Sequence, residues 1–156
     1  MRDVIEQSLY LPAPREKVWR AISEPAGLAG WFSSKGIEGE IVPGKDIVFC
    51  FEMSPTSAED GRCRARIVAL EPNSRFAYRW FPGSCSVAEI TDERSTLVEL
   101  LLTDEGDGTR ITVRESGFAS LPAEVGEYAF GQNDEGWAEC LASLEKHAEE
   151  WNKQTA

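Results

Sequence analysis

The chain has 156 residues, a length at which one domain buries roughly two thirds of the surface that its unfolded chain exposes. Its formal net charge is −11, from 27 acidic against 16 basic residues. Such a field repels polyanions, so neither nucleic acid nor an anionic membrane is an expected partner. We expect one domain over residues 1–156, whose acidity serves mainly its solubility.

Neither a targeting segment nor a metal motif stands out. The N-terminal stretch MRDVIEQSLYLP has no apolar core of signal-peptide length, and no run approaches a membrane span, which favours the cytoplasm. Cys50, Cys63, Cys85 and Cys140 are scattered, without a C-x-x-C pair or a histidine nearby in sequence. We therefore expect reduced thiols that behave as small hydrophobic residues, and no zinc site.

The first third of the chain predicts a strand, two short helices and further strands. Residues 4–11 alternate and end at Pro12, as a strand does. Pro14 suits the first turn of a helix, and Pro25 ends that helix and opens a second, whose apolar residues are Leu28, Trp31 and Phe32. Strands are expected over 37–42 and 47–52, on either side of the turn at Pro43-Gly44.

The remainder predicts more strands and one long helix. A polar loop over 54–61 precedes strands at 62–70, 75–81, 95–103 and 110–116, with a hairpin signal at Asp107-Gly108. We expect 117–131 to be an irregular crossing, because Pro122, Gly126 and Gly131 oppose one continuous helix. Residues 133–151 carry apolar side chains at helical spacing. This order predicts an α+β fold, with a curved antiparallel sheet of about six to seven strands wrapped around the C-terminal helix.

Four segments resemble, in the right order, motifs of one known family. They are PREKVWRAISEPAGLAGWF at 14–32, EPNSRFAYRW at 71–80, GDGTRITVRESGF at 106–118 and GWAECLASL at 136–144. Together they resemble the helix-grip (SRPBCC) superfamily, which includes START domains, polyketide cyclases and the birch-pollen-allergen proteins. They are most similar to the family named after the activator of the heat-shock-protein-90 ATPase, in its small single-domain bacterial form.

This resemblance implies a helix-grip fold and a cavity between the sheet and the C-terminal helix that holds a small apolar or amphipathic molecule. The matching positions are core, turn and packing residues and include no catalytic set. The chain departs from the family's Pro-Gly-Gly turn, since it reads Pro43-Gly44-Lys45, and its loops at 54–61 and 82–94 look variable. Those loops would decide how open such a cavity is.

A surplus of aromatic residues marks a candidate ligand site. For any one of them a place in the core is the simpler interpretation, but together they exceed what one amphipathic helix needs to cover. Trp137 and Cys140, near the start of the last helix, are expected in the cavity wall, and Gly136 would leave room beside them. The full aromatic set is Trp31, Phe49, Phe51, Tyr78, Trp80, Phe130 and Trp137.

Glu115 is the other candidate, with two interpretations. It shares a strand face with Ile111 and Val113, so its carboxylate either points inward, where it needs partners, or lies at a solvated rim. Glu99 poses the same question. Arg66 and Arg79 are possible counter-charges, although arginines at alternating positions usually mark a solvent-facing side.

Three function classes remain, in order of preference. The first is a binding module for a small hydrophobic ligand, with no cofactor. The second is a protein-interaction module that stimulates a chaperone ATPase, as the family name suggests. The third is an enzyme similar to polyketide cyclases, with Glu115 and Tyr78 as acid and base. His147, the one histidine, needs no more explanation than its place near a helix C-terminus, and no nucleotide-binding motif is present. The sequence predicts no oligomeric state.

Overall fold

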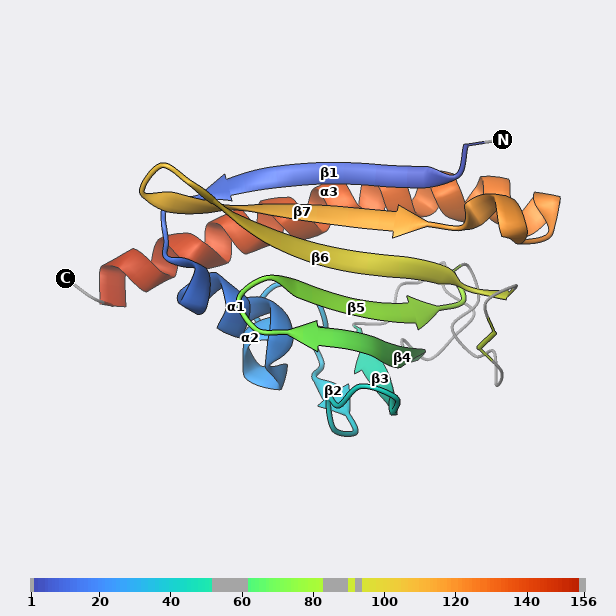
Figure 1. Ribbon diagram of the computed structural model, residues 1–156, viewed down its shortest axis with the longest axis horizontal. Coiled ribbons are helices and arrows are strands. Elements are labelled where there is room, and N and C mark those ends of the chain that lie inside the picture. Colours follow the sequence, from blue (N-terminus) through green and yellow to red (C-terminus); the bar gives the residue numbers. More distant parts are fainter. Residues whose placement is uncertain (1, 52–61, 83–89, 92–93, 155–156) are drawn as a thin grey trace.

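The computed structural model describes residues 2–51, 62–82, 90–91 and 94–154. Seven strands form one antiparallel sheet in the order β1-β7-β6-β5-β4-β3-β2. Figure 1 shows the long helix α3 running behind β1 and β7 along the sheet, with α1 and α2 gathered toward its C-terminal end. This arrangement confirms the expected helix-grip α+β fold.

The bounds of most elements agree with the sequence pattern. The first strand, the first two helices and the two central hairpins form where the alternation, the prolines and the turn residues predict. The elements are β1 (Val4–Leu11), α1 (Arg15–Ser23), α2 (Pro25–Ala29), β2 (Ile37–Glu38), β3 (Asp46–Cys50), β4 (Arg62–Glu71), β5 (Arg75–Trp80), β6 (Thr96–Glu105), β7 (Gly108–Ser116), the 3-10 turn η2 (Phe118–Ser120) and α3 (Ala123–Gln154).

Three predicted boundaries are wrong. The strand expected over 37–42 ends after Glu38, because Gly39 has a φ of 99° and leaves the extended conformation. The loop of the β6–β7 hairpin lies one residue earlier than expected: Gly106, with a φ of 56°, and Asp107 form the loop, and Gly108 already pairs with Glu105. The expected loop at 54–61 lies outside the described residues.

The third error concerns the expected crossing over 117–131. Only its first part is irregular, and α3 begins directly after Pro122 and includes Gly126 and Gly131. A glycine inside a helix costs about 1 kcal/mol relative to alanine. Burial of Ala129 and Phe130 against the core outweighs that cost, so tertiary packing decides where this helix starts.

The inner face of the sheet carries the core. One row crosses five strands through the register pairs Ile5–Glu115, Glu115–Val98, Val98–Tyr78 and Tyr78–Ile67, and all five side chains are at most 2% exposed. Four members of the row are apolar or aromatic, as a sheet face under a helix requires. Glu115 is the exception. A buried ionisable side chain among apolar ones often marks a functional site, so the surroundings of Glu115 are the candidate site.

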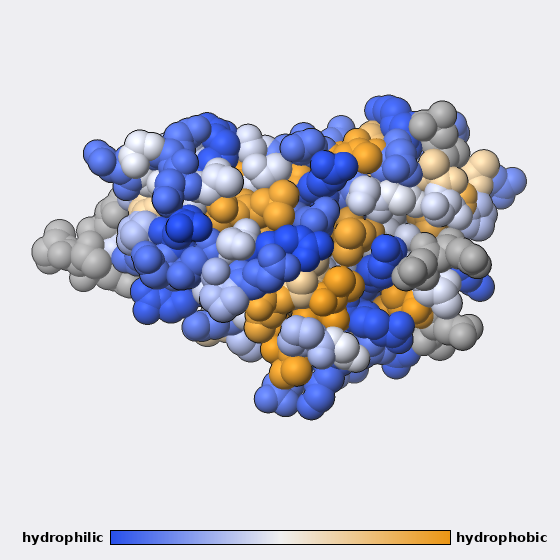
Figure 2. Space-filling view, viewed as in Figure 1, coloured by the Kyte–Doolittle hydropathy of each residue, from blue (hydrophilic) through white to orange (hydrophobic). Residues whose placement is uncertain are grey.

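The outer face of the sheet is charged. Figure 2 shows hydrophilic residues interleaved with hydrophobic ones over these strands. Ion pairs join neighbouring strands there: Arg66 Nε lies 3.0 Å from Asp46 Oδ1, and Arg75 Nε lies 2.8 Å from Glu99 Oε2. The alternation of arginines along β4 therefore marks the solvent side, as the pattern indicates.

Cysteine chemistry differs from the expectation at one position. Cys63 is disulfide-bonded, whereas Cys50 and Cys140 are not in a disulfide. The expectation of four reduced thiols is therefore wrong for Cys63, since spacing along a chain does not determine which sulfur atoms meet in space.

Within the described residues, no helix combines the length and the apolar composition that a membrane span requires.

Candidate functional site

Glu115 is a fully buried carboxylate near the end of β7. Its side chain is on the inner face with those of Ile111 and Val113, and its exposed fraction is 0%. Pairing with Ile5 on one side and Val98 on the other keeps this position in the interior of the sheet. Of the two interpretations offered by the sequence, the inward one is correct.

Four neutral groups donate hydrogen bonds to this carboxylate. The indole N–H of Trp137 donates to Oε1 at 2.8 Å, and that of Trp80 donates to Oε2 at 2.9 Å. The Asn133 amide donates to both oxygens, at 2.9 and 3.1 Å, and the Thr96 hydroxyl donates to Oε2. A buried charge needs such partners, and here they come from β5, β6 and α3. The network therefore joins the sheet to the helix through one side chain.

The suggested counter-charges lie elsewhere. Arg66 and Arg79 alternate along their strands with the buried residues Ile67 and Tyr78, so they belong to the outer face. Arg66 pairs with Asp46, and the Arg79 guanidinium donates to the Ser95 hydroxyl at 3.3 Å. Glu99 is paired with Arg75 on the same outer side. All the hydrogen-bond donors found for Glu115 among the described residues are uncharged.

A pocket of about 170 Å³ lies directly over this network. Three of its lining residues, Trp80, Asn133 and Trp137, are also donors to Glu115. The carboxylate is thus separated from the pocket by the thickness of one side chain. The described residues that line it are Phe32, Phe51, Trp80, Asn133, Gly136, Trp137 and Cys140.

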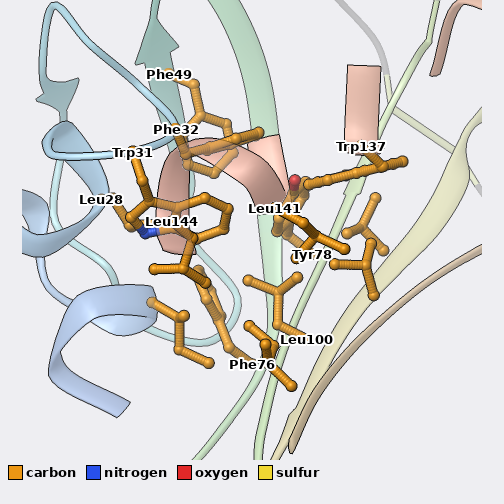
Figure 3. Close-up of a cluster of buried hydrophobic side chains, with 14 of the residues drawn as sticks. Leu28, Trp31, Phe32, Phe49, Phe76, Tyr78, Leu100, Trp137, Leu141 and Leu144 are labelled. Carbon is orange, nitrogen blue, oxygen red and sulfur yellow. The ribbon is translucent and has the colours of Figure 1, made fainter. Parts of the chain in front are cut away.

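The aromatic rings at the pocket pack on one another and hold its shape. The Phe32 ring stacks on Trp137 with centroids 5.4 Å apart and planes at 5°, and it meets Phe51 edge-on at 5.1 Å. The centroids of Trp80 and Trp137 are 6.2 Å apart. Figure 3 shows Phe32, Phe49 and Trp137 gathered over the sheet at this level of the core. Ring contacts of this kind stabilise an arrangement beyond the area they bury.

Tyr78 adds a buried hydroxyl below the rings. Its oxygen has no hydrogen-bond partner among the residues that the structure describes, and Figure 3 shows it directed toward α3 beside Trp137. Burial, together with the charges of Glu115 and Cys140, raises the pKa of this phenol well above its usual value. The hydroxyl therefore keeps its proton at neutral pH.

The structure brings together about half of the predicted site residues. Phe51, Trp80, Trp137 and Cys140 line the pocket, Gly136 lies among them as expected, and Glu115 lies beneath. The remaining aromatic residues of the predicted set are buried in the core and do not line the pocket, although Phe49 and Tyr78 contact the Trp80 ring. Trp31 donates its indole N–H to the Ala21 carbonyl at 2.8 Å, Phe49 is fully buried beside Tyr78, and Phe130 packs edge-on against Phe118.

Sequence reasoning missed Phe32, Asn133 and Thr96 as site residues. Asn133 precedes Trp137 by one helical turn and Cys140 by two, so extending the apolar stripe to polar residues would have included it. Thr96 faces Trp80 in the β5–β6 register, which no sequence pattern reveals. Phe32 lies beyond the end of α2, where helical periodicity no longer indicates a direction.

Comparison with known proteins agrees with this architecture. Protein MLL2253 from Mesorhizobium loti is 23% identical over 94% of this chain and 97% of its own, with a TM-score of 0.72. Aha1 from Colwellia psychrerythraea, solved as a dimer in solution, is 19% identical over 92% and 94%, with a TM-score of 0.70. Protein BH1534 from Bacillus halodurans is 24% identical over 95% and 97%, with a TM-score of 0.64.

At these identities the solved structures establish the fold alone. No curated protein sequence matches the chain. The family described as Activator of Hsp90 ATPase homolog 1-like protein matches residues 12–149, nearly the whole length. The chain therefore belongs to that family, within the SRPBCC superfamily of helix-grip proteins.

Proposed function

We propose that this protein is a binding module for a small apolar or amphipathic molecule, held in the pocket between the sheet and α3. The observation that carries the proposal is the pairing of an aromatic-lined pocket with a buried network that fixes its walls. Trp80 from β5 and Asn133 and Trp137 from α3 are oriented by one carboxylate. A site whose walls are held in place in advance loses little entropy when it binds.

The volume of the pocket limits the bound group to about the size of one ring. An engineered apolar cavity of about 150 Å³ binds benzene, and this pocket measures about 170 Å³. It is therefore suited to a benzene-sized or slightly larger group, with any longer tail extending into solvent. A whole lipid chain does not fit inside a volume of this size.

Two glycines of α3 give a matched pair of variants for the test. A Cβ added at Gly136 or at Gly131 meets no atom within 4 Å, so both sites have room for a side chain. Only Gly136 lines the pocket. Gly136→Leu fills the pocket from inside, whereas Gly131→Leu makes the same chemical change in the same helix outside it.

The test is a titration with one-ring aromatic compounds, followed through the indole N–H signals of Trp80 and Trp137. The wild type and Gly131→Leu are expected to show saturable shifts, and Gly136→Leu none. Equal responses in the two variants, or no saturable shift in the wild type across a panel of such compounds, would exclude a ligand site at this pocket.

Stimulation of a chaperone ATPase is the second candidate, and family membership is the observation that favours it. The candidate predicts that the purified chain raises the ATPase rate of the chaperone from the same host in a coupled assay. Gly136→Leu separates the two functions: stimulation that persists when the pocket is filled would not depend on a ligand in the pocket. No stimulation at saturating protein would remove this candidate.

An acid–base enzyme using Glu115 and Tyr78 has the least support. Both oxygens of Glu115 already accept hydrogen bonds from the protein, and burial raises the pKa of Tyr78. Neither residue is among those that line the pocket. General acid–base catalysis requires a group within hydrogen-bonding reach of the substrate.

A further inference from the structure

We propose that the pocket selects organic cations: a ring-sized group that carries a positively charged nitrogen, such as a quaternary or aromatic ammonium, binds in preference to a neutral or anionic group of the same shape. This inference rests on the proposed function and names the chemical class of its ligand. It follows from three features of the pocket: the charge beneath it, the rings around it and the field of the whole chain.

The charge beneath the pocket is the carboxylate of Glu115. It is fully buried, and its hydrogen-bond donors among the described residues are all neutral. Those donors satisfy its oxygen atoms without cancelling its charge. Because water is excluded around it, this charge is screened far less than one on the surface. A cation seated over Trp80 and Trp137 would lie one side chain away from it.

The rings strengthen this preference. Four of the seven described residues that line the pocket are aromatic: Phe32, Phe51, Trp80 and Trp137. The face of an aromatic ring attracts a cation, most strongly for tryptophan. The N–H group is the most positive part of an indole ring. In both tryptophans it donates a hydrogen bond to Glu115, at 2.9 Å for Trp80 and 2.8 Å for Trp137. Hydrogen bonds to a carboxylate polarise the donor, so the part of each indole left to the pocket becomes more electron-rich.

The same features oppose an anion. No lysine, arginine or histidine is among the described residues that line the pocket, so these residues offer a bound carboxylate or phosphate no counter-charge. It would also enter the field of a chain with a formal charge of −11. Asn133 does not compensate, because its amide N–H₂ is already directed at Glu115. Its carbonyl oxygen, the other end of the fixed amide, is an acceptor and favours a ligand with a donor.

Three compounds of nearly equal shape test the inference. They are phenyltrimethylammonium, tert-butylbenzene and benzenesulfonate, which carry a positive, a neutral and a negative tetrahedral group on the same ring. Titrations are followed through the indole N–H signals of Trp80 and Trp137, with Gly136→Leu as the blocked-pocket control. We expect phenyltrimethylammonium to bind about tenfold more tightly than tert-butylbenzene, a ratio of the size that a cation–π contact supplies, and benzenesulfonate not to saturate.

Two variants test how much of the preference for a cation comes from the Glu115 charge and how much from the aromatic rings. Glu115→Gln removes the charge and keeps one of the two acceptor oxygens, and Phe51→Leu replaces a half-buried ring of the pocket with an aliphatic side chain. The preference for the cation is expected to fall to about threefold or less in Glu115→Gln and to fall partly in Phe51→Leu. If Glu115→Gln does not fold, the affinities of the wild type for the three compounds test the inference without it. Raising NaCl from about 0.05 M to about 0.5 M should remove only the part of the cation's affinity that comes from the field of the whole chain, because the buried Glu115 charge is little screened, and leave tert-butylbenzene unaffected.

The outcomes distinguish this inference from the proposed function. Equal affinity of wild type for the cation and the neutral compound, both lost in Gly136→Leu, would overturn the cation preference and leave the binding module in place. A preference that persists unchanged in folded Glu115→Gln would also overturn it. Failure of all three compounds to bind, with wild type and Gly136→Leu alike, would contradict both proposals.

Discussion

Helix α3 has two halves that meet the sheet in different ways. Its first half carries Asn133, Gly136, Trp137 and Cys140 to a pocket above a buried charge. Its second half carries Leu141, Leu144, Ala148 and Trp151, all buried, into a filled apolar core. Figure 3 shows Leu144 packed beside Leu28 and Trp31, where helices α1 and α2 close that end of the fold.

Two glycines summarise the difference. A Cβ added at Gly30, after α2, would lie 2.5 Å from Cε1 of His147, so the imidazole ring already occupies the space beside this glycine. A Cβ added at Gly136 meets nothing within 4 Å. Absence of a side chain thus serves close packing at one end of α3 and open volume at the other. The same helix both stabilises the fold and leaves space for a ligand.

The largest expected effect is at the pocket end, from Glu115→Ala. It removes the acceptor of two buried bonds, from Thr96 and Trp137, and each buried donor without a partner costs about 1–3 kcal/mol. We expect the free energy of unfolding to fall by about 3 kcal/mol or more, measured by urea denaturation.

Glu99→Ala is the matched control for that variant. It removes a carboxylate of β6 whose partner is Arg75 on the outer face, so the expected loss is below about 1 kcal/mol. Similar losses from the two variants would contradict the special position of Glu115 in the buried network.

The next largest effect is expected at the filled end of the core, under the second half of α3. Gly30→Ala places a methyl group against the His147 ring, and overpacking of this kind costs about 1–3 kcal/mol. The double variant Gly30→Ala with His147→Ala should lose less stability than the sum of the two single variants, because the second change makes room for the first. Strict additivity in urea denaturation would show that the imidazole and Gly30 are not coupled.

Alkaline pH should weaken the pocket end in a graded way. Burial, and secondarily the charge of Glu139, raises the pKa of the Cys140 thiol from 9.0 to about 12. The folded chain therefore holds this proton where the unfolded chain has lost it. Stability should fall as pH rises from about 9 toward about 12, by up to about 1.4 kcal/mol per pH unit from this group.

Cys140→Ala should flatten that decline, and Cys50→Ala, at the other cysteine outside a disulfide, provides the comparison. Thermal unfolding at intervals of pH gives the slopes. A slope above pH 9 that is the same in wild type and Cys140→Ala would show that this thiol does not titrate differently in the two states.

The smallest effect has the opposite sign. Gly136→Ala adds a methyl group in open space and removes the entropic cost of a glycine inside a helix, so the free energy of unfolding should rise by about 0.5–1 kcal/mol. Affinity for a one-ring ligand should fall in the same variant, because the methyl group takes up part of the pocket. Loss of stability would show that the space beside Gly136 is already filled.

The sequence alone determined the order of elements and the fold class. Alternation along 4–11, 62–70 and 75–81, prolines at positions 14 and 25, and the apolar stripe of 133–151 are local signals, and local signals act through backbone sterics and periodic burial. They also identified Glu115 and Trp137 as unusual, because a carboxylate in an apolar alternation and a tryptophan beside a glycine stand out without a structure.

Only the tertiary structure decided which of these residues meet. The sheet register brings Thr96 to Trp80 and Glu115 under α3, and packing extends α3 through two glycines that the sequence interprets as breaks. The sequence left open whether Glu115 points into the core or lies at the solvated rim of the sheet, because the same alternation along the strand is compatible with both. The network of four neutral donors around one buried charge is set by contacts across 18 to 35 residues of chain, and such contacts leave no periodic trace in the sequence.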